Sequence, residues 1–347
     1  TFLMFGKEDE DILNYFINTA FPSEREAADI MEYISNNDGV KLYQINSALN
    51  IKKARLDKAI SFLMHDGFIR KEKQTYYATP KPFVYDKEHY DAVTATRVRE
   101  MEQMKRLATT TTCYSKFVVE CLDDHSAYEC GHCSNCLGQD ILPSSPLMES
   151  VHIAETYING LVLDIEPRKM WVYSEYTGNK KIPVPNKPGL CLAKYGDPGY
   201  GELVKRDKYS SKKRFCDELV GKSANVLRPL VNEKGIKYIT CVPSLRSDIV
   251  LDFSKRLAES LGLTFVELLK KSNTRPQKEM QNSSYQCGNA MRSFNLLDGV
   301  EVPDKVLLVD DVVDSRWTLT ACGYYLSQGG CGEIYPFALA DSSQKED

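Results

Sequence analysis

The sequence contains no run of about 18 apolar residues, the length that a transmembrane helix needs. Its first residues also lack the basic start and apolar stretch of a secretory signal. The chain has no overall positive charge, since its formal net charge is −4. These absences predict a protein with no membrane partner. They also exclude a globally basic nucleic-acid binder, although a local basic patch remains compatible with them.

What is present is the composition of an ordinary globular protein, with 42% hydrophobic and 27% charged residues. At roughly 100–200 residues per domain, the 347 residues predict two or three domains. The 11 cysteines are an odd number, and three of them are closely spaced. This pattern favours metal ligands and free thiols in a reducing compartment, so we expect a cytoplasmic location.

Residues 23–81 have the pattern of a small separate domain. Ser23 and Glu26 have the spacing of a helix-capping box. Helical periodicity, a short extended segment, two further helices and a hairpin then follow. This is the order of elements in a winged helix.

The helix-turn-helix and hairpin of this segment are rich in basic residues. Residues 50–74 contain seven Lys or Arg and three Asp or Glu, a local net charge of +4 with His neutral. Such a patch suits contacts with DNA phosphates, and a solvated face of a protein-interaction domain is the alternative. The candidate DNA-binding residues are Lys52, Lys53, Arg55, Lys58, Arg70, Lys71 and Lys73.

Four cysteines have the spacing of a metal site. Cys130, Cys133 and Cys136 form a CxxCxxC motif, and Cys113 precedes it by sixteen intervening residues. Three thiolates at this spacing can converge on one ion, and Gly131 permits the tight turn between the first two. The distant cysteine completes a tetrahedral set. We therefore expect structural zinc, and an iron–sulfur cluster is the alternative that spacing alone does not exclude.

The cysteine segment resembles the zinc-binding segment of RecQ-family ATP-dependent DNA helicases, in its spacing and in the sequence Cys130-Gly-His-Cys-Ser-Asn-Cys-Leu137. Residues 2–16 are similar to the end of the second helicase-core domain and its exit helix. The order departs from the common RecQ plan, because here the winged helix precedes the zinc segment. The sequence most resembles a RecQ-like subgroup with that order and an appended phosphoribosyltransferase-like domain.

This resemblance implies a C-terminal fragment of a helicase that acts in DNA unwinding, repair or recombination. Its implied partners are DNA, as duplex, junction or single-stranded ends, and the helicase core. Neither a GxxxxGK[ST] loop nor a DExH box is found, so this chain is not expected to hydrolyse ATP by that route.

The start at Thr1, within an apolar segment, suggests an excised fragment, and a processed terminus is the alternative. The expected domains are the core tail (1–22), winged helix (23–81), zinc module (82–137), linker (138–160) and phosphoribosyltransferase-like domain (161–347).

Strand-like and helical patterns alternate in the C-terminal half. Buried apolar strands are expected at 238–242, 306–309 and 334–340, with helices between them. Alternation of this kind predicts a parallel sheet with ligands at the carboxyl ends of its strands. The fold class expected for the whole chain is multidomain, α+β and α/β, with a winged helix, a small helical zinc module and a parallel-sheet domain.

An acidic pair follows one of these strands. Asp310 and Asp311 come directly after residues 306–309, and two such carboxylates can reach vicinal ribose hydroxyls and a hydrated magnesium ion. The next loop leads into a helix N-terminus, which favours a phosphate, and Ser315 and Thr318 can add hydroxyl donors. The alternative is an acidic turn that caps a helix, which explains one carboxylate but not both.

This segment resembles the phosphoribosyl-pyrophosphate loop of type I phosphoribosyltransferases, especially the competence-associated branch. Residues 242–246, Val-Pro-Ser-Leu-Arg, are similar to the family's pyrophosphate-contacting loop. The resemblance implies that the acidic pair holds the ribose diol, with magnesium as the accompanying ion. The ligand-binding residues that it implies are Asp310, Asp311, Asp314, Ser315, Arg316, Trp317, Thr318, Ser244 and Arg246.

Arg316 stands where the family loop usually has Gly. A non-Gly residue in the left-handed conformation costs about 1–2 kcal/mol. Asp314 adds a negative charge beside the expected phosphate. We therefore predict a degenerate transferase with weak or absent phosphoribosyl-pyrophosphate binding.

A second basic cluster is either a phosphate or DNA surface or a solvated loop, and it comprises Lys205, Arg206, Lys208, Lys212, Lys213 and Arg214.

Three functions remain open from the sequence. The first is a DNA-binding accessory region of a RecQ-like helicase with a degenerate transferase-like domain. The second is an active phosphoribosyltransferase, using phosphoribosyl pyrophosphate and magnesium, whose front half is a targeting module. The third is a scaffold whose sheet domain binds partner proteins.

Overall fold

The computed structural model describes residues 6, 8–124, 126, 128–141, 143, 145–173, 177, 178, 180–272 and 275–343. The chain divides into two compact units, residues 1–147 and residues 148–347. Residues 1–5 and 7, part of the segment that resembles the end of a helicase core, lie outside the described residues. Among the residues described, no helix is long and apolar enough to cross a membrane.

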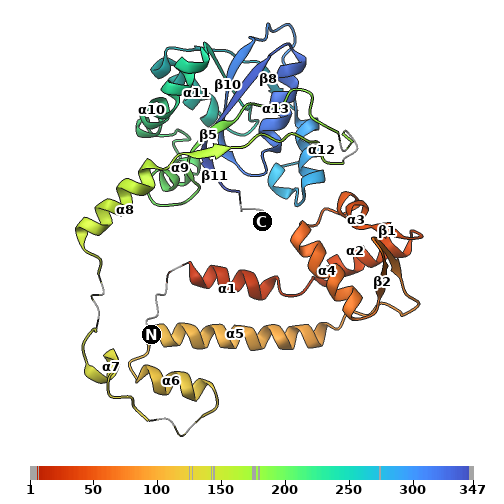
Figure 1. The fold of residues 1–347 in the computed structure, drawn as a ribbon, viewed down its shortest axis with the longest axis vertical. Coiled ribbons are helices and arrows are strands. Elements are labelled where there is room, and N and C mark those ends of the chain that lie inside the picture. Colours follow the sequence, from red (N-terminus) through yellow and green to blue (C-terminus); the bar gives the residue numbers. More distant parts are fainter. Residues whose placement is uncertain are drawn as a thin grey trace. The chain divides into compact units, whose positions relative to one another are not determined.

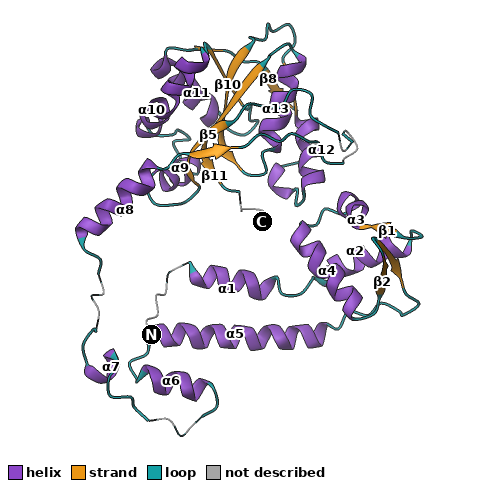
Figure 2. Ribbon diagram, in the orientation of Figure 1, coloured by secondary structure: helices purple, strands orange, loops and turns teal. Residues whose placement is uncertain are grey.

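The first unit is mostly helical (Figure 2). Its three-stranded antiparallel sheet has the order β1-β3-β2. Its elements are α1 (Asp9–Asn18), α2 (Glu24–Ser35), β1 (Val40–Lys41), α3 (Leu42–Ala48), α4 (Lys53–His65), β2 (Ile69–Glu72), β3 (Thr75–Ala78), α5 (Lys87–Thr109), α6 (Tyr114–Cys121) and α7 (Ser134–Leu137). From α2 to β3 the elements come in the predicted order of helix, strand, helix, helix and hairpin.

Local chemistry explains how this segment begins and what holds it together. The Ser23 hydroxyl accepts a hydrogen bond from the Glu26 backbone N–H (3.2 Å), and the Glu26 carboxylate accepts one from the Ser23 N–H (2.9 Å). This is the predicted capping box, and it satisfies two donors at the start of α2. Apolar side chains from α2, α4 and the hairpin, such as Ile34 and Leu56, then form one buried cluster.

The second unit is built on a six-stranded sheet of order β4-β5-β11-β10-β6-β7, in which all neighbours are parallel except β4 and β5. The predicted parallel-sheet α/β class is therefore confirmed. Its strands are β4 (Leu163–Ile165), β5 (Gly189–Lys194), β6 (Tyr238–Cys241), β7 (Thr264–Phe265), β8 (Leu269–Lys271), β9 (Phe294–Leu296), β10 (Lys305–Val313) and β11 (Glu333–Asp341), of which β8 and β9 form a separate antiparallel pair.

Helices cover both faces of the sheet, with α10 and α11 on one side and α12 and α13 on the other (Figure 1). The helices are α8 (Met148–Gly160), α9 (Tyr200–Lys208), α10 (Asp217–Lys234), α11 (Ile249–Leu261), α12 (Ser283–Ser293) and α13 (Trp317–Gln328), with a 3₁₀ turn at Gln277–Glu279. Over residues 306–309, side chains of β10 alternate between the faces, so that Val306 and Leu308 pack with α12 and α13, whereas Leu307 and Val309 pack with α10 and α11.

Two elements differ from expectation. Part of the stretch expected to be a linker, residues 138–160, is the helix α8. The acidic pair also does not follow the end of its strand, because β10 continues to Val313. On the β6 side, however, pairing ends at Val309 with Cys241, so Asp310 and Asp311 lie beyond the carboxyl end of the neighbouring strand. On the other side, Asp310 still pairs with Ala338 of β11.

Candidate functional site

The four predicted metal ligands lie together in the first unit. The sulfur atoms of Cys113, Cys130, Cys133 and Cys136 are all within 4.8 Å of one another. Gly131, between the first two thiols of the motif, has φ +74°, a conformation that is strained for a residue with a side chain. Cys113 lies just before α6 and Cys136 lies in α7, so two short helices carry the ends of the set.

Backbone donors prepare these thiols to bind a cation. The Cys130 N–H donates to Cys113 Sγ (3.2 Å), and this bond is the main cause of a lowered pKa for the Cys113 thiol. Backbone N–H groups likewise lower the pKa of Cys130 and of Cys133, whereas the neighbouring Cys133 sulfur raises the pKa of Cys136. Four convergent thiols with such donors fit zinc, which binds the deprotonated form.

His132 lies inside the motif, but its side chain is engaged elsewhere. Its Nδ1 is 2.7 Å from the Cys130 carbonyl oxygen. The imidazole therefore has a partner outside the thiol cluster, and the four-cysteine set stands without it.

The basic residues of the first unit divide into two groups. Lys52 and Lys53 at the start of α4, and Lys73 at the tip of the β2–β3 hairpin, are exposed, and no ion pair is found for them among the described residues. The others have contacts within the unit. Lys58 Nζ donates to the Thr19 carbonyl oxygen (3.2 Å) and Arg70 pairs with Glu72.

Arg55, one of the predicted DNA-binding residues, has an acidic partner within the unit. Its guanidinium donates to both carboxylate oxygens of Glu26, at 2.7 and 2.5 Å, and its side chain is 25% exposed. The hydrogen bond raises the pKa of Arg55, and the same pair contributes to the lowered pKa of Glu26 against the opposing effect of burial. Arg55 therefore connects α4 to the start of α2, and we leave it out of the proposed phosphate contacts. No sequence pattern indicated that Glu26 would serve both the capping box and this pair.

In the second unit, the two carboxylates of the acidic pair have different surroundings. Asp310 lies toward α13, because its charge acts together with burial to raise the pKa of the Cys322 thiol on that helix. Asp311 instead pairs with Lys208 of α9, a helix that packs in the other apolar cluster. Asp310 is 8% exposed and accepts a hydrogen bond from the Asp311 backbone N–H (2.9 Å). Burial, followed by the charge of Asp311, raises the pKa of Asp310 to about 8.

Asp311 already has a cationic partner. Its Oδ2 is 3.0 Å from Lys208 Nζ, and the two side chains are 17% and 28% exposed. Its Oδ1 accepts from the Val312 N–H (2.7 Å). Lys208 belongs to the basic cluster for which a DNA or phosphate surface is one interpretation, but no sequence signal indicates that it reaches the acidic strand.

The residues after β10 form a turn into α13. Arg316 has φ +67° and ψ −2°, so it adopts the left-handed conformation expected where the family has Gly. Its guanidinium donates to the Glu166 carbonyl oxygen (3.2 Å). Arg168 Nε donates to the Ser315 carbonyl oxygen (2.8 Å), so the segment before β5 lies against this turn. No pattern in the sequence indicated the role of Arg168.

Trp317 does not offer its side chain to a ligand. It is 1% exposed, it stacks on Trp171 with ring centroids 6.1 Å apart, and the Arg168 guanidinium carbon lies 4.2 Å from its ring centroid. The side chain of Trp317, which the resemblance includes among the ligand-binding residues, is therefore packed inside the unit. What remains available there are the first backbone N–H groups of α13 and the half-buried Ser315 and Thr318.

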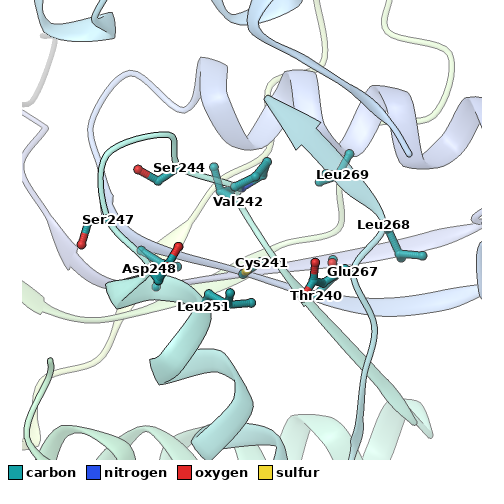
Figure 3. Close-up of a pocket in the computed structure, with 12 residues that line it drawn as sticks. Thr240, Cys241, Val242, Ser244, Ser247, Asp248, Leu251, Glu267, Leu268 and Leu269 are labelled. Carbon is teal, nitrogen blue, oxygen red and sulfur yellow. The ribbon is translucent and has the colours of Figure 1, made fainter. Parts of the chain in front are cut away.

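A pocket of about 190 Å³ lies at the carboxyl end of β6, beside the predicted pyrophosphate loop. Ser244 lines it, whereas Arg246 is exposed and is not among its lining residues. The charged residues of its lining are Asp248 and Glu267, on either side of Cys241 in Figure 3. A pocket bordered by two carboxylates is unfavourable for a pyrophosphate, since like charges repel.

Magnesium does not fit the acidic strand as it stands. The ion prefers carboxylates and water in an octahedral shell. Here one carboxylate is paired with Lys208, and the other is buried. The arrangement can hold a lysine ammonium group but offers no cluster of free oxygen ligands.

Comparison with known proteins gives matches of three kinds: a family model, a curated relative and solved structures. Residues 58–137 match the family model described as RecQ zinc-binding. The chain is also similar to competence protein ComFC of Streptococcus pneumoniae, with 29% identity over 83 residues. That match covers 24% of this chain and 37% of the relative, so the chain spans much less than two thirds of the relative's length.

Among solved structures, the chain is similar to a hypoxanthine phosphoribosyltransferase of Trypanosoma cruzi, with 15% identity and a TM-score of 0.27 over 36% of this chain and 63% of that one. It is also similar to a purine phosphoribosyltransferase of Pyrococcus horikoshii, with 16% identity and a TM-score of 0.26 over 37% and 87% of the two chains. The residues that match the zinc-binding family model thus run from within α4 to just beyond Cys136, and they include all four cysteines of the cluster.

Proposed function

We propose that the chain is a DNA-binding accessory region of a RecQ-like ATP-dependent DNA helicase, with an appended phosphoribosyltransferase-like domain of degenerate activity. The observation that carries this proposal is the match of residues 58–137 to the RecQ zinc-binding model, in a segment whose four cysteine thiols converge. ATP hydrolysis belongs to a helicase core, whose motifs this sequence lacks.

In this proposal the first unit, residues 1–147 and called the front unit below, binds the DNA backbone with a winged helix. Lys52 and Lys53 lie at the amino end of α4, where the helix dipole also favours an anion. Arg70, Lys71 and Lys73 lie on the hairpin that forms the wing, and Lys58 completes the set. A bound zinc ion would be held by the thiolates of Cys113, Cys130, Cys133 and Cys136 and would hold α6 and α7 together.

The DNA part of the proposal is tested by charge reversal. Lys53→Glu with Lys71→Glu should weaken binding of a tailed duplex and reduce the log–log salt slope by about 0.9 for each phosphate that is no longer neutralised. Fluorescence anisotropy between low and moderate salt measures both quantities. Lys205→Glu, an exposed lysine of the second unit, is the matched control and should leave the slope unchanged. If the double variant keeps native affinity and slope, the winged helix is a protein-interaction module.

Three observations support a degenerate site in the second unit. The ion pair of Asp311 with Lys208 occupies one carboxylate of the acidic strand. Asp314, in the loop expected to hold a phosphate, is exposed. The pocket beside the predicted pyrophosphate loop is bordered by Asp248 and Glu267. Each of these adds negative charge or removes a ligand group where a phosphorylated sugar would bind.

One observation favours the alternative of an active phosphoribosyltransferase with a front targeting module. Arg316 already has the left-handed backbone that the family's Gly would adopt, so the loop retains its shape. An Arg guanidinium is also a good partner for a phosphate.

Calorimetry with magnesium and phosphoribosyl pyrophosphate decides between these two functions of the second unit. For a degenerate site, the native protein should bind weakly or not at all, and Arg316→Gly should not bind more weakly than it. Micromolar binding by the native protein that Arg316→Gly abolishes would instead establish the alternative.

A further inference from the structure

The end of α9 is fixed so that Lys208 faces the acidic strand. Its neighbour Asp207 is 6% exposed and accepts hydrogen bonds from the Arg206 side chain (2.9 Å) and from the Cys216 backbone N–H (2.8 Å). These contacts join the last turn of α9 to the start of α10. Lys208 therefore does not reach Asp311 as a freely moving surface lysine, but from a helix end that a buried carboxylate holds in place.

The ion pair itself is sheltered. Lys208 and Asp311 are 3.0 Å apart with less than a third of either side chain exposed. Screening by water and salt is weaker for such a pair than for one on the open surface. The second oxygen of Asp311 accepts from the Val312 N–H, so hydrogen bonding or ion pairing engages both oxygens.

We propose that Lys208 is the built-in cation of the acidic strand, and that it excludes a divalent metal ion from Asp311. The inference rests on the proposed degenerate site in the second unit and gives that degeneracy a cause. A lysine ammonium group and a divalent cation cannot both lie against the same carboxylate, because two positive charges at this distance repel strongly.

The inference predicts a gain of metal binding, which misfolding does not produce. Binding of Mn²⁺ to the zinc-loaded full chain is measured from the signal of free Mn²⁺ in electron paramagnetic resonance. Native protein should show no Mn²⁺ site that depends on Asp311. Lys208→Gln should bind Mn²⁺ at least about tenfold more tightly than native protein, because the competing charge is gone.

Matched variants identify the site. Lys208→Arg keeps the charge and should stay as low in affinity as native protein. Lys205→Gln removes an exposed lysine from the same helix and should also change nothing. Adding Asp311→Asn to Lys208→Gln should abolish the gained binding.

Two outcomes would overturn the inference. One is native protein that binds Mn²⁺ as tightly as Lys208→Gln and loses that binding with Asp311→Asn. The other is Lys208→Gln that gains no affinity. Neither outcome would contradict the proposal that the transferase-like site is degenerate. That proposal fails separately if native protein binds magnesium and phosphoribosyl pyrophosphate in the micromolar range.

Discussion

The two units hold their chemically distinctive residues in opposite ways. In the front unit, the thiols of Cys113, Cys130, Cys133 and Cys136 come from short helices and turns, and neither α6 nor α7 has a buried residue among those described. In the second unit, residues 148–347 and called the rear unit below, Asp310 and Asp311 belong to a strand that is packed on both faces by large apolar clusters. One site lacks a core of its own, and the other is built into one.

This difference indicates where the folding energy of each site comes from. A segment without a hydrophobic core needs another source of stability, and a structural metal ion can provide it. A strand within a packed sheet keeps its position whatever its polar side chains do, so its carboxylates can change partners without loss of fold. A substitution of a thiol in the front unit should therefore change both the stability and the function of its site. A substitution in the acidic strand of the rear unit can change function while the fold is kept.

The largest effect is expected from breaking the thiol cluster. Cys133→Ser should lose zinc and unfold the segment around residues 113–137, since structural zinc contributes about 10–16 kcal/mol of apparent binding free energy. Hydrogen exchange should rise there. Both tryptophans, Trp171 and Trp317, lie in the rear unit, so the fluorescence-detected unfolding of that unit should be unchanged. Elemental analysis of native protein that shows no zinc, or iron in its place, would contradict the assignment.

A smaller effect is expected at the buried carboxylate of the rear site. The pKa of Asp310 is raised from 3.8 to about 8, mainly by burial. The folded state therefore binds this proton more tightly than the unfolded state, and stability falls as pH rises from about 4 to about 8. Asp310→Asn should remove this loss and stabilise the rear unit at pH 8.5 by on the order of a few kcal/mol, with little change at pH 4.

Denaturant unfolding followed by tryptophan fluorescence at the two pH values measures this effect. Asp304→Asn, another aspartate of the same unit outside the acidic strand, serves as the control. An equal change at both pH values for Asp310→Asn would mean that the carboxyl group does not titrate as described.

The smallest effect separates structural from DNA-contacting basic residues in the front unit. Arg55→Gln should destabilise that unit by about 1 kcal/mol, because it breaks a largely sheltered pair with Glu26. Its DNA salt slope should stay native. Lys53→Gln, two residues away on the exposed side of α4, should show the reverse pattern. If Arg55→Gln alters the slope as much as Lys53→Gln does, Arg55 contacts phosphate after all.

Sequence patterns predicted those features that depend on neighbouring residues. The capping box of Ser23 and Glu26, the element order up to β3 and the convergence of CxxCxxC with Cys113 all follow from local spacing. The left-handed conformation at Arg316 was foreseeable because the loop it resembles needs it.

What the sequence could not predict are partners brought together by the fold. Glu26 and Arg55 are 29 residues apart, and Lys208 meets Asp311 from a different helix. The burial of Trp317 depends on Trp171 and Arg168, which precede it by well over a hundred residues. The run of apolar residues that ends at Val309 also did not reveal that β10 continues to Val313 and includes Asp310 and Asp311.

The central claim, that DNA binds to the front unit and not to the rear one, is tested most directly by hydrogen exchange with and without DNA. A tailed duplex added to the native chain should protect the start of α4 and the β2–β3 hairpin, residues 52–73. The rear unit, including the basic segment at residues 205–214, should exchange at the same rate with and without DNA. Protection of residues 205–214 with none at residues 52–73 would contradict the account.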